Sequence, residues 1–150
     1  MKKFTAIVLL LANFVLCSCS LPKDDVLESL GKYTCKTYYT SGGFQDFTDY
    51  AIYTFDNVNF SDNKYFNRIS FDSRKELERH IADFENWISI IQRTEPDNEV
   101  VTGYDFELSA VSSDDYLYIY DDPEYPELGN YNIYYFDIET MTLYYFHNNI

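Results

Sequence analysis

The chain has 150 residues, with 25 Asp and Glu against 11 Lys and Arg, so its formal net charge is −14. Apolar residues make up 46% and charged residues 24%, a balance typical of a globular chain rather than a disordered one. The length predicts a single domain, and the low Gly and Pro content excludes collagen-like and linker-like chains. Because the acidic excess repels phosphates, we expect no nucleic-acid partner.

The N-terminus predicts an export signal. Two lysines precede the apolar segment Phe4–Leu16, whose 13 residues suit the apolar region of a signal peptide and are too few to span a bilayer comfortably. The stretch Leu16–Cys19 then resembles the lipobox of bacterial lipoproteins, with a small Ser immediately before the final Cys. This resemblance implies cleavage after residue 18 and a diacylglyceryl thioether on Cys19.

Two alternatives remain open at this terminus. Cys17 is a competing site, although it places the bulky Leu16 before the cysteine, and the segment can also be an ordinary secretory signal. The lipoprotein interpretation predicts a signal peptide at 1–18, the lipidated Cys19 with a tether at 19–31, and one domain at 32–150. Acyl chains of the palmitate type would then hold the domain on the extracytoplasmic side of the cell membrane. Cys35 is the remaining thiol, and we expect it to be buried in a strand.

The residues of the domain before its helix predict a hairpin. Tyr33–Tyr39 and Tyr50–Phe55 are rich in aromatic and β-branched residues, and a Ser-Gly-Gly segment lies between them. Tyr65–Ile69 has an extended pattern but is ambiguous.

A helix is expected next. Ser73 and Glu76 have the spacing of a capping box, and Pro96 ends the pattern. Between them an apolar stripe recurs at intervals of three and four residues, formed by Leu77, Ile81, Phe84, Ile88 and Ile91.

The C-terminal third has a period of two. It predicts strands at Val100–Glu107, Tyr116–Tyr120, Asn130–Phe136 and Thr142–His147, with a tight turn between the last two. The predicted fold class is therefore α+β, with an antiparallel sheet of about five to six strands and one long helix packed on one face.

Motifs for catalysis are missing from the sequence. It contains no G-x-S-x-G, P-loop, G-x-G-x-x-G or H-E-x-x-H pattern. We therefore expect no catalytic residue, no cofactor and no metal site, and we interpret His80 as a packed helix residue. Acidic loops that bind calcium, or a carboxylate pair in a small hydrolase, are weaker alternatives.

The aromatic residues of the last strands carry the functional hypothesis. If Leu117, Ile119, Ile133 and Leu143 face the helix, the opposite face presents Tyr118, Tyr120, Tyr134, Phe136, Tyr144 and Phe146. Such rings stack on sugars or supply rigid contact area at protein interfaces. The alternatives are that they stabilise the sheet through cross-strand pairs or that another segment covers them.

The aromatic strand Asp115–Tyr120 and the closing run Tyr134–Asn149 are similar to those of small, uncharacterised lipoproteins of Gram-positive bacteria. That class has no assigned activity, so the resemblance implies no site residues. The expected function is a membrane-anchored, non-catalytic binding module with an envelope protein as partner, and a glycan as the second choice.

Overall fold

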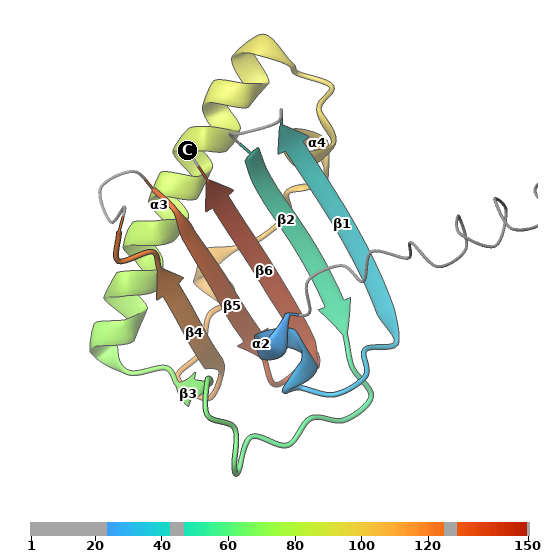
Figure 1. Ribbon diagram of the computed structural model, residues 1–150, viewed down its shortest axis with the longest axis vertical. Helices are drawn as coiled ribbons and strands as arrows, with labels where there is room; N and C mark the ends of the chain where they lie inside the picture. The colour runs from blue at the N-terminus through green and yellow to red at the C-terminus, as the bar shows by residue number, and fades with distance from the viewer. Residues whose placement is uncertain (1–23, 43–46, 125–128, 150) are drawn as a thin grey trace, which may run out of the picture.

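The computed structural model describes residues 24–42, 47–124 and 129–149. Their strands form a single antiparallel sheet in the order β1-β2-β6-β5-β4-β3 (Figure 1). The strands are β1 (Cys35–Gly42), β2 (Phe47–Thr54), β3 (Asn67–Arg68), β4 (Tyr116–Asp121), β5 (Tyr131–Asp137) and β6 (Thr142–Asn149). The α+β class and the antiparallel sheet are confirmed. The expected signal peptide, Cys19 and the first part of the tether lie outside the described residues.

Helix α3 (Phe71–Thr94) lies across one face of the sheet, behind the strands in Figure 1. Four residues of its apolar stripe are buried as predicted, with Leu77 and Phe84 fully inaccessible, whereas Ile91 near the end of the helix is half-buried. The helix begins one turn earlier than the sequence indicated. Ser70 is the N-cap and exchanges hydrogen bonds with Ser73, which therefore occupies the third helical position instead of the cap.

The strand predicted at Val100–Glu107 is wrong. Its first part forms the short helix α4 (Glu99–Gly103), and a 3₁₀ turn, η1 (Leu108–Ala110), follows it. Asn98 caps α4 by accepting a hydrogen bond from the Val100 amide at 3.0 Å. The cap and the complete burial of Val100 outweigh the β-propensity of this segment.

The second face of the sheet, which points to the viewer in Figure 1, carries the short helix α2 (Asp25–Glu28). Leu30 is buried there, and Val26 and Leu27 pack beside it. The end of the segment that the sequence assigned to the tether thus packs on the sheet. We call this face the α2 face and the opposite one the helix face.

Two further findings concern the free thiol of Cys35 and the helices. Cys35 is exposed at the start of the edge strand β1, so its predicted burial is wrong. An edge strand has a neighbour on only one side, which leaves its first residue open to solvent. Among the described residues, no helix is both long and apolar enough to cross a bilayer.

Candidate functional site

The six aromatic residues proposed as a platform do not share one face. Tyr118, Tyr120, Tyr134 and Phe136 lie on the α2 face, as predicted. Tyr144 and Phe146 instead point to the helix face, where Phe146 packs on Phe84. Leu143, which was expected to face the helix, lies on the α2 face. The prediction therefore placed the side chains of β6 on the wrong faces of the sheet. This strand has consecutive aromatic residues, so the alternation of apolar and polar residues does not show which face is buried.

One half of the α2 face is covered. Helix α2 and residues 55–66 pack over Phe136, which is fully buried, and over Tyr134. The Tyr134 hydroxyl donates a hydrogen bond of 3.0 Å to Asp24, the N-cap of α2. These two rings are therefore part of a second core and do not form a contact surface.

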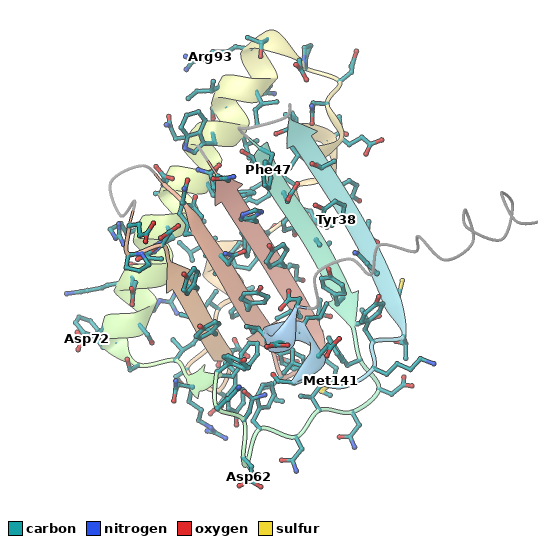
Figure 2. The ribbon with its side chains drawn as sticks, viewed as in Figure 1. Tyr38, Phe47, Asp62, Asp72, Arg93 and Met141 are labelled. Carbon is teal, nitrogen blue, oxygen red and sulfur yellow. The ribbon has the colours of Figure 1, made fainter. Side chains whose placement is uncertain are left out.

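The other half of the α2 face is exposed to solvent at its two sides, on strands β1 and β4. Tyr38 on β1 is 43% exposed and Tyr120 on β4 is 46% exposed. Between them lie the partly exposed side chains of Asn132, Tyr145 and His147. Side chains of this face are drawn as sticks in Figure 2, where Tyr38 is labelled.

Strand register arranges these side chains in two parallel rows. The first row, which we call the polar row, runs through directly paired residues of five strands: Thr40, Asp49, His147, Asn132 and Tyr120. The second, the tyrosine row, contains Tyr38, Ala51, Tyr145, Tyr134 and Tyr118. The rows are connected by a hydrogen bond of 2.8 Å from the Tyr145 hydroxyl to Asn132.

Asp49 occupies the polar row with its side chain only 7% exposed. The imidazole Nδ1 of His147 donates to its Oδ2 at 3.2 Å, whereas the buried Oδ1 has no hydrogen bond of regular geometry. Burial raises the pKa of Asp49, but hydrogen bonding with His147, Thr40 and Tyr38 outweighs burial, and the pKa lies below its ordinary value. The lowered pKa favours the ionised form of Asp49, and its buried Oδ1 lacks a hydrogen bond of regular geometry.

The same carboxylate affects Tyr38. Burial and then hydrogen bonding to Asp49 raise the pKa of the Tyr38 hydroxyl above its ordinary value. Around the carboxylate, the ring of Phe47 contacts His147 edge-on, with ring centroids 4.8 Å apart. The site can accept hydrogen bonds and present aromatic surface.

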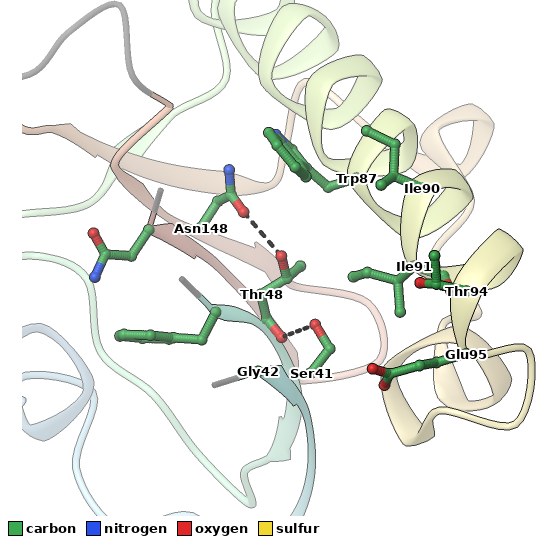
Figure 3. Close-up of a pocket in the computed structure, with 11 residues that line it drawn as sticks. Ser41, Gly42, Thr48, Trp87, Ile90, Ile91, Thr94, Glu95 and Asn148 are labelled. Atoms are coloured by element: carbon green, nitrogen blue, oxygen red, sulfur yellow. Dashed lines mark hydrogen bonds between the residues drawn. The ribbon is translucent and has the colours of Figure 1, made fainter. Parts of the chain in front are cut away.

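A separate pocket of about 180 Å³ lies on the helix face between the last turns of α3 and the ends of β1, β2 and β6 (Figure 3). Trp87, Ile90 and Ile91 form its apolar wall. Its buried polar floor is already satisfied, since Thr48 donates to Asn148 at 2.9 Å and Asn148 donates to a backbone carbonyl at 3.0 Å. The pocket has room for one apolar side chain. The polar side chains of its floor already have hydrogen-bond partners in the protein, so they are not free to bind a ligand.

Two residues of the acidic loops considered as calcium sites, Asp115 and Asp121, have other partners. Asp115 is buried and accepts hydrogen bonds from the Tyr135 hydroxyl and from two backbone amides. Asp121 lies 2.7 Å from Nε2 of His80, which is itself buried on α3. Within ranges 24–42, 47–124 and 129–149, no group of three or more His, Cys, Asp or Glu residues has an arrangement that could hold a metal ion.

Sequence reasoning missed the central members of the site, Asp49, His147, Tyr38 and Tyr145. A signal was present, because Asp49 immediately precedes the predicted strand Tyr50–Phe55 and His147 ends another predicted strand. Which residues oppose each other across strands is set by register, which no local pattern specified.

Comparison with known proteins found no matching family model, no similar curated protein and no similar solved structure. The functional argument therefore depends on the chemistry of the site.

Proposed function

We propose that the protein is an extracytoplasmic lipoprotein, anchored through Cys19, whose folded part is a non-catalytic module that binds an envelope protein. The binding surface is the open half of the α2 face. The observation that carries this proposal is the composition of the polar row, which contains Thr, His, Asn and Tyr with one buried carboxylate, in a chain with 25 acidic residues.

Interface centres have few charged groups and many Tyr, because tyrosine gives a large contact area with little loss of side-chain entropy. Here Tyr38 on β1 and Tyr120 on β4 are both almost half exposed, at opposite sides of the open half of the α2 face. A surface built from side chains of five neighbouring strands suits a protein partner better than a small molecule, which prefers a concave site.

The partner can be tested by photo-crosslinking in intact cells. Tyr120 is replaced by p-benzoylphenylalanine in the full chain, and Gln92, exposed on α3, is the matched control position. We expect one defined crosslinked protein from position 120 and not from position 92. The same products from both positions, or none from position 120, would refute a protein-binding role for this face.

A glycan is the second candidate, because tyrosine rings next to hydroxyl and amide groups can stack on sugars and hydrogen-bond to them. In a pull-down on purified cell-wall glycan, a Tyr38→Ala and Tyr120→Ala double variant of the full chain should lose retention only if this alternative is correct. The anchor is tested separately by metabolic labelling with radioactive palmitate. A Cys19→Ser variant should lose the label and a Cys35→Ser variant should keep it.

A further inference from the structure

Asp49 is an unusual residue for the middle of a sheet. Aspartate is depleted in strands, and burying a carboxylate is costly unless hydrogen bonds satisfy it. Most buried polar atoms in proteins have a partner, and an orphaned one calls for a specific explanation. Among the described residues, Oδ1 of Asp49 is the one fully buried side-chain oxygen or nitrogen found without a hydrogen bond of regular geometry.

The surroundings of Asp49 favour a positively charged ligand. Apart from the 3.2 Å contact with His147, no ion pair to Asp49 is found among the described residues. The neighbouring tyrosine rings already accept a cation, since the Lys36 ammonium lies 4.7 Å from the ring centroid of Tyr38 and 5.3 Å from that of Tyr53. A carboxylate beside aromatic rings is a recurrent way to bind ammonium and guanidinium groups.

Charges of both signs lie near the site. The Lys36 ammonium supplies one positive charge beside Tyr38. On the same face, burial and then the negative charges of Asp24 and Asp49 raise the pKa of Tyr145. The chain as a whole carries −14, which attracts a basic partner over a longer distance.

We propose that Asp49 is the anchoring acceptor of the binding surface and takes the guanidinium or ammonium group of an Arg or Lys side chain from the partner protein. This inference rests on the proposed binding function and specifies its chemistry. Tyr38 lies on the edge strand with its side chain partly in solvent, so it can rotate away and expose the carboxylate. The incoming group donates to Oδ1 while its alkyl stem lies against the rings of Tyr38 and Tyr145, the partly exposed members of the tyrosine row nearest to Asp49.

The test uses the full chain in detergent micelles and two blocked peptides, acetyl-Gly-Arg-Gly-amide and its norleucine counterpart. Binding is followed by NMR through the imidazole signals of His147. We expect saturable shifts with the arginine peptide and none with the norleucine peptide. Asp49→Asn should weaken binding at least tenfold, whereas Asp62→Asn, which removes one charge from an exposed loop, should change it less than twofold.

A further variant keeps the test decisive if Asp49→Asn does not fold. His147→Ala frees the second carboxylate oxygen for a bidentate contact, so it should tighten binding of the arginine peptide severalfold, followed through the Tyr38 ring signals. Equal weakening by Asp49→Asn and Asp62→Asn would show nonspecific charge attraction and overturn the proposal. An unchanged affinity in Asp49→Asn, or shifts caused equally by an N-acetylglucosamine oligomer, would also overturn it.

The crosslinking at position 120 separates the two proposals. One outcome is a crosslink at full yield in Asp49→Asn, together with no response of the protein to the arginine peptide. That pair of results overturns the role of Asp49 and leaves the binding function intact. Loss of the crosslink in Asp49→Asn but not in Asp62→Asn supports the proposed role of Asp49.

Discussion

The buried tyrosines should make the protein unfold abruptly in alkali. Among the described residues, five tyrosines are buried in the two cores, namely Tyr50, Tyr53, Tyr131, Tyr134 and Tyr135. Four of their hydroxyls donate to carboxylates at 2.7–3.0 Å. Burial raises the pKa of all five, to about 12 for Tyr53, whereas an unfolded tyrosine titrates near pH 10.

The direction of the effect follows from proton binding. Above pH 10 the unfolded chain releases phenol protons that the folded state retains, so the free energy of unfolding decreases as the pH rises. Each such tyrosine contributes a slope of about 1.4 kcal/mol per pH unit once the unfolded group is ionised. Five of them give about 7 kcal/mol per unit, so a domain stable by roughly 5–15 kcal/mol should unfold within about two units above pH 10.

Phenolate absorbance at 295 nm and far-UV circular dichroism, recorded together from pH 8 to pH 13, test this expectation. The exposed tyrosines should ionise first, and the buried ones should ionise in the same narrow range in which the dichroism is lost. In concentrated guanidinium chloride all tyrosines should titrate together near pH 10. If the native protein also ionised all its tyrosines near pH 10 with unchanged dichroism, the inferred burial would be refuted.

Three substitutions test the packing, with urea unfolding as the measurement. Phe146→Ala should lower the free energy of unfolding by about 3–5 kcal/mol, because this ring is fully buried under α3; a loss below about 1 kcal/mol would contradict the position of β6. Asp115→Ala should lower the free energy of unfolding by about 2–4 kcal/mol, because it leaves buried donors unpaired. The control Asp114→Ala removes an exposed ion pair and should lower it by less than about 1 kcal/mol. Equal effects of the two substitutions would exclude a structural role for Asp115. Gly103→Ala should lower the free energy of unfolding by about 1–3 kcal/mol, because the added Cβ would collide with the Tyr39 ring. A neutral result would show that α4 does not pack on β1.

Strong local patterns in the sequence predicted individual elements well. The apolar stripe of α3 identified the helix because its 3.6-residue period extends over more than four turns. The strands β4, β5 and β6 were recognised because their aromatic and β-branched residues are bounded by turn residues. The strand predicted at Val100–Glu107 is wrong for two reasons: Asn98 caps a short helix there, and the burial of Val100 in the core outweighs the β-propensity of the segment.

The face of each strand depended on long-range contacts. Tyr144, Tyr145 and Phe146 follow one another, so either parity buries an aromatic ring, and pairing with β2 and β5 decides between them. Burial of Tyr134 and Phe136 was equally invisible locally, because the segments that cover them, 24–30 and 55–66, are distant in sequence. Two of the six proposed rings therefore belong to the helix-face core and two to the second core.

The sequence by itself determined the composition, the charge, the α+β class and the periodic elements, because each depends on residue types or on contacts between near neighbours. Only the tertiary structure decided which half of the α2 face stays open and which residues meet there. Asp49 and His147 are 98 positions apart, and they become neighbours solely because β6 inserts between β2 and β5. A site built across strands depends on register, and register is a property of the whole sheet.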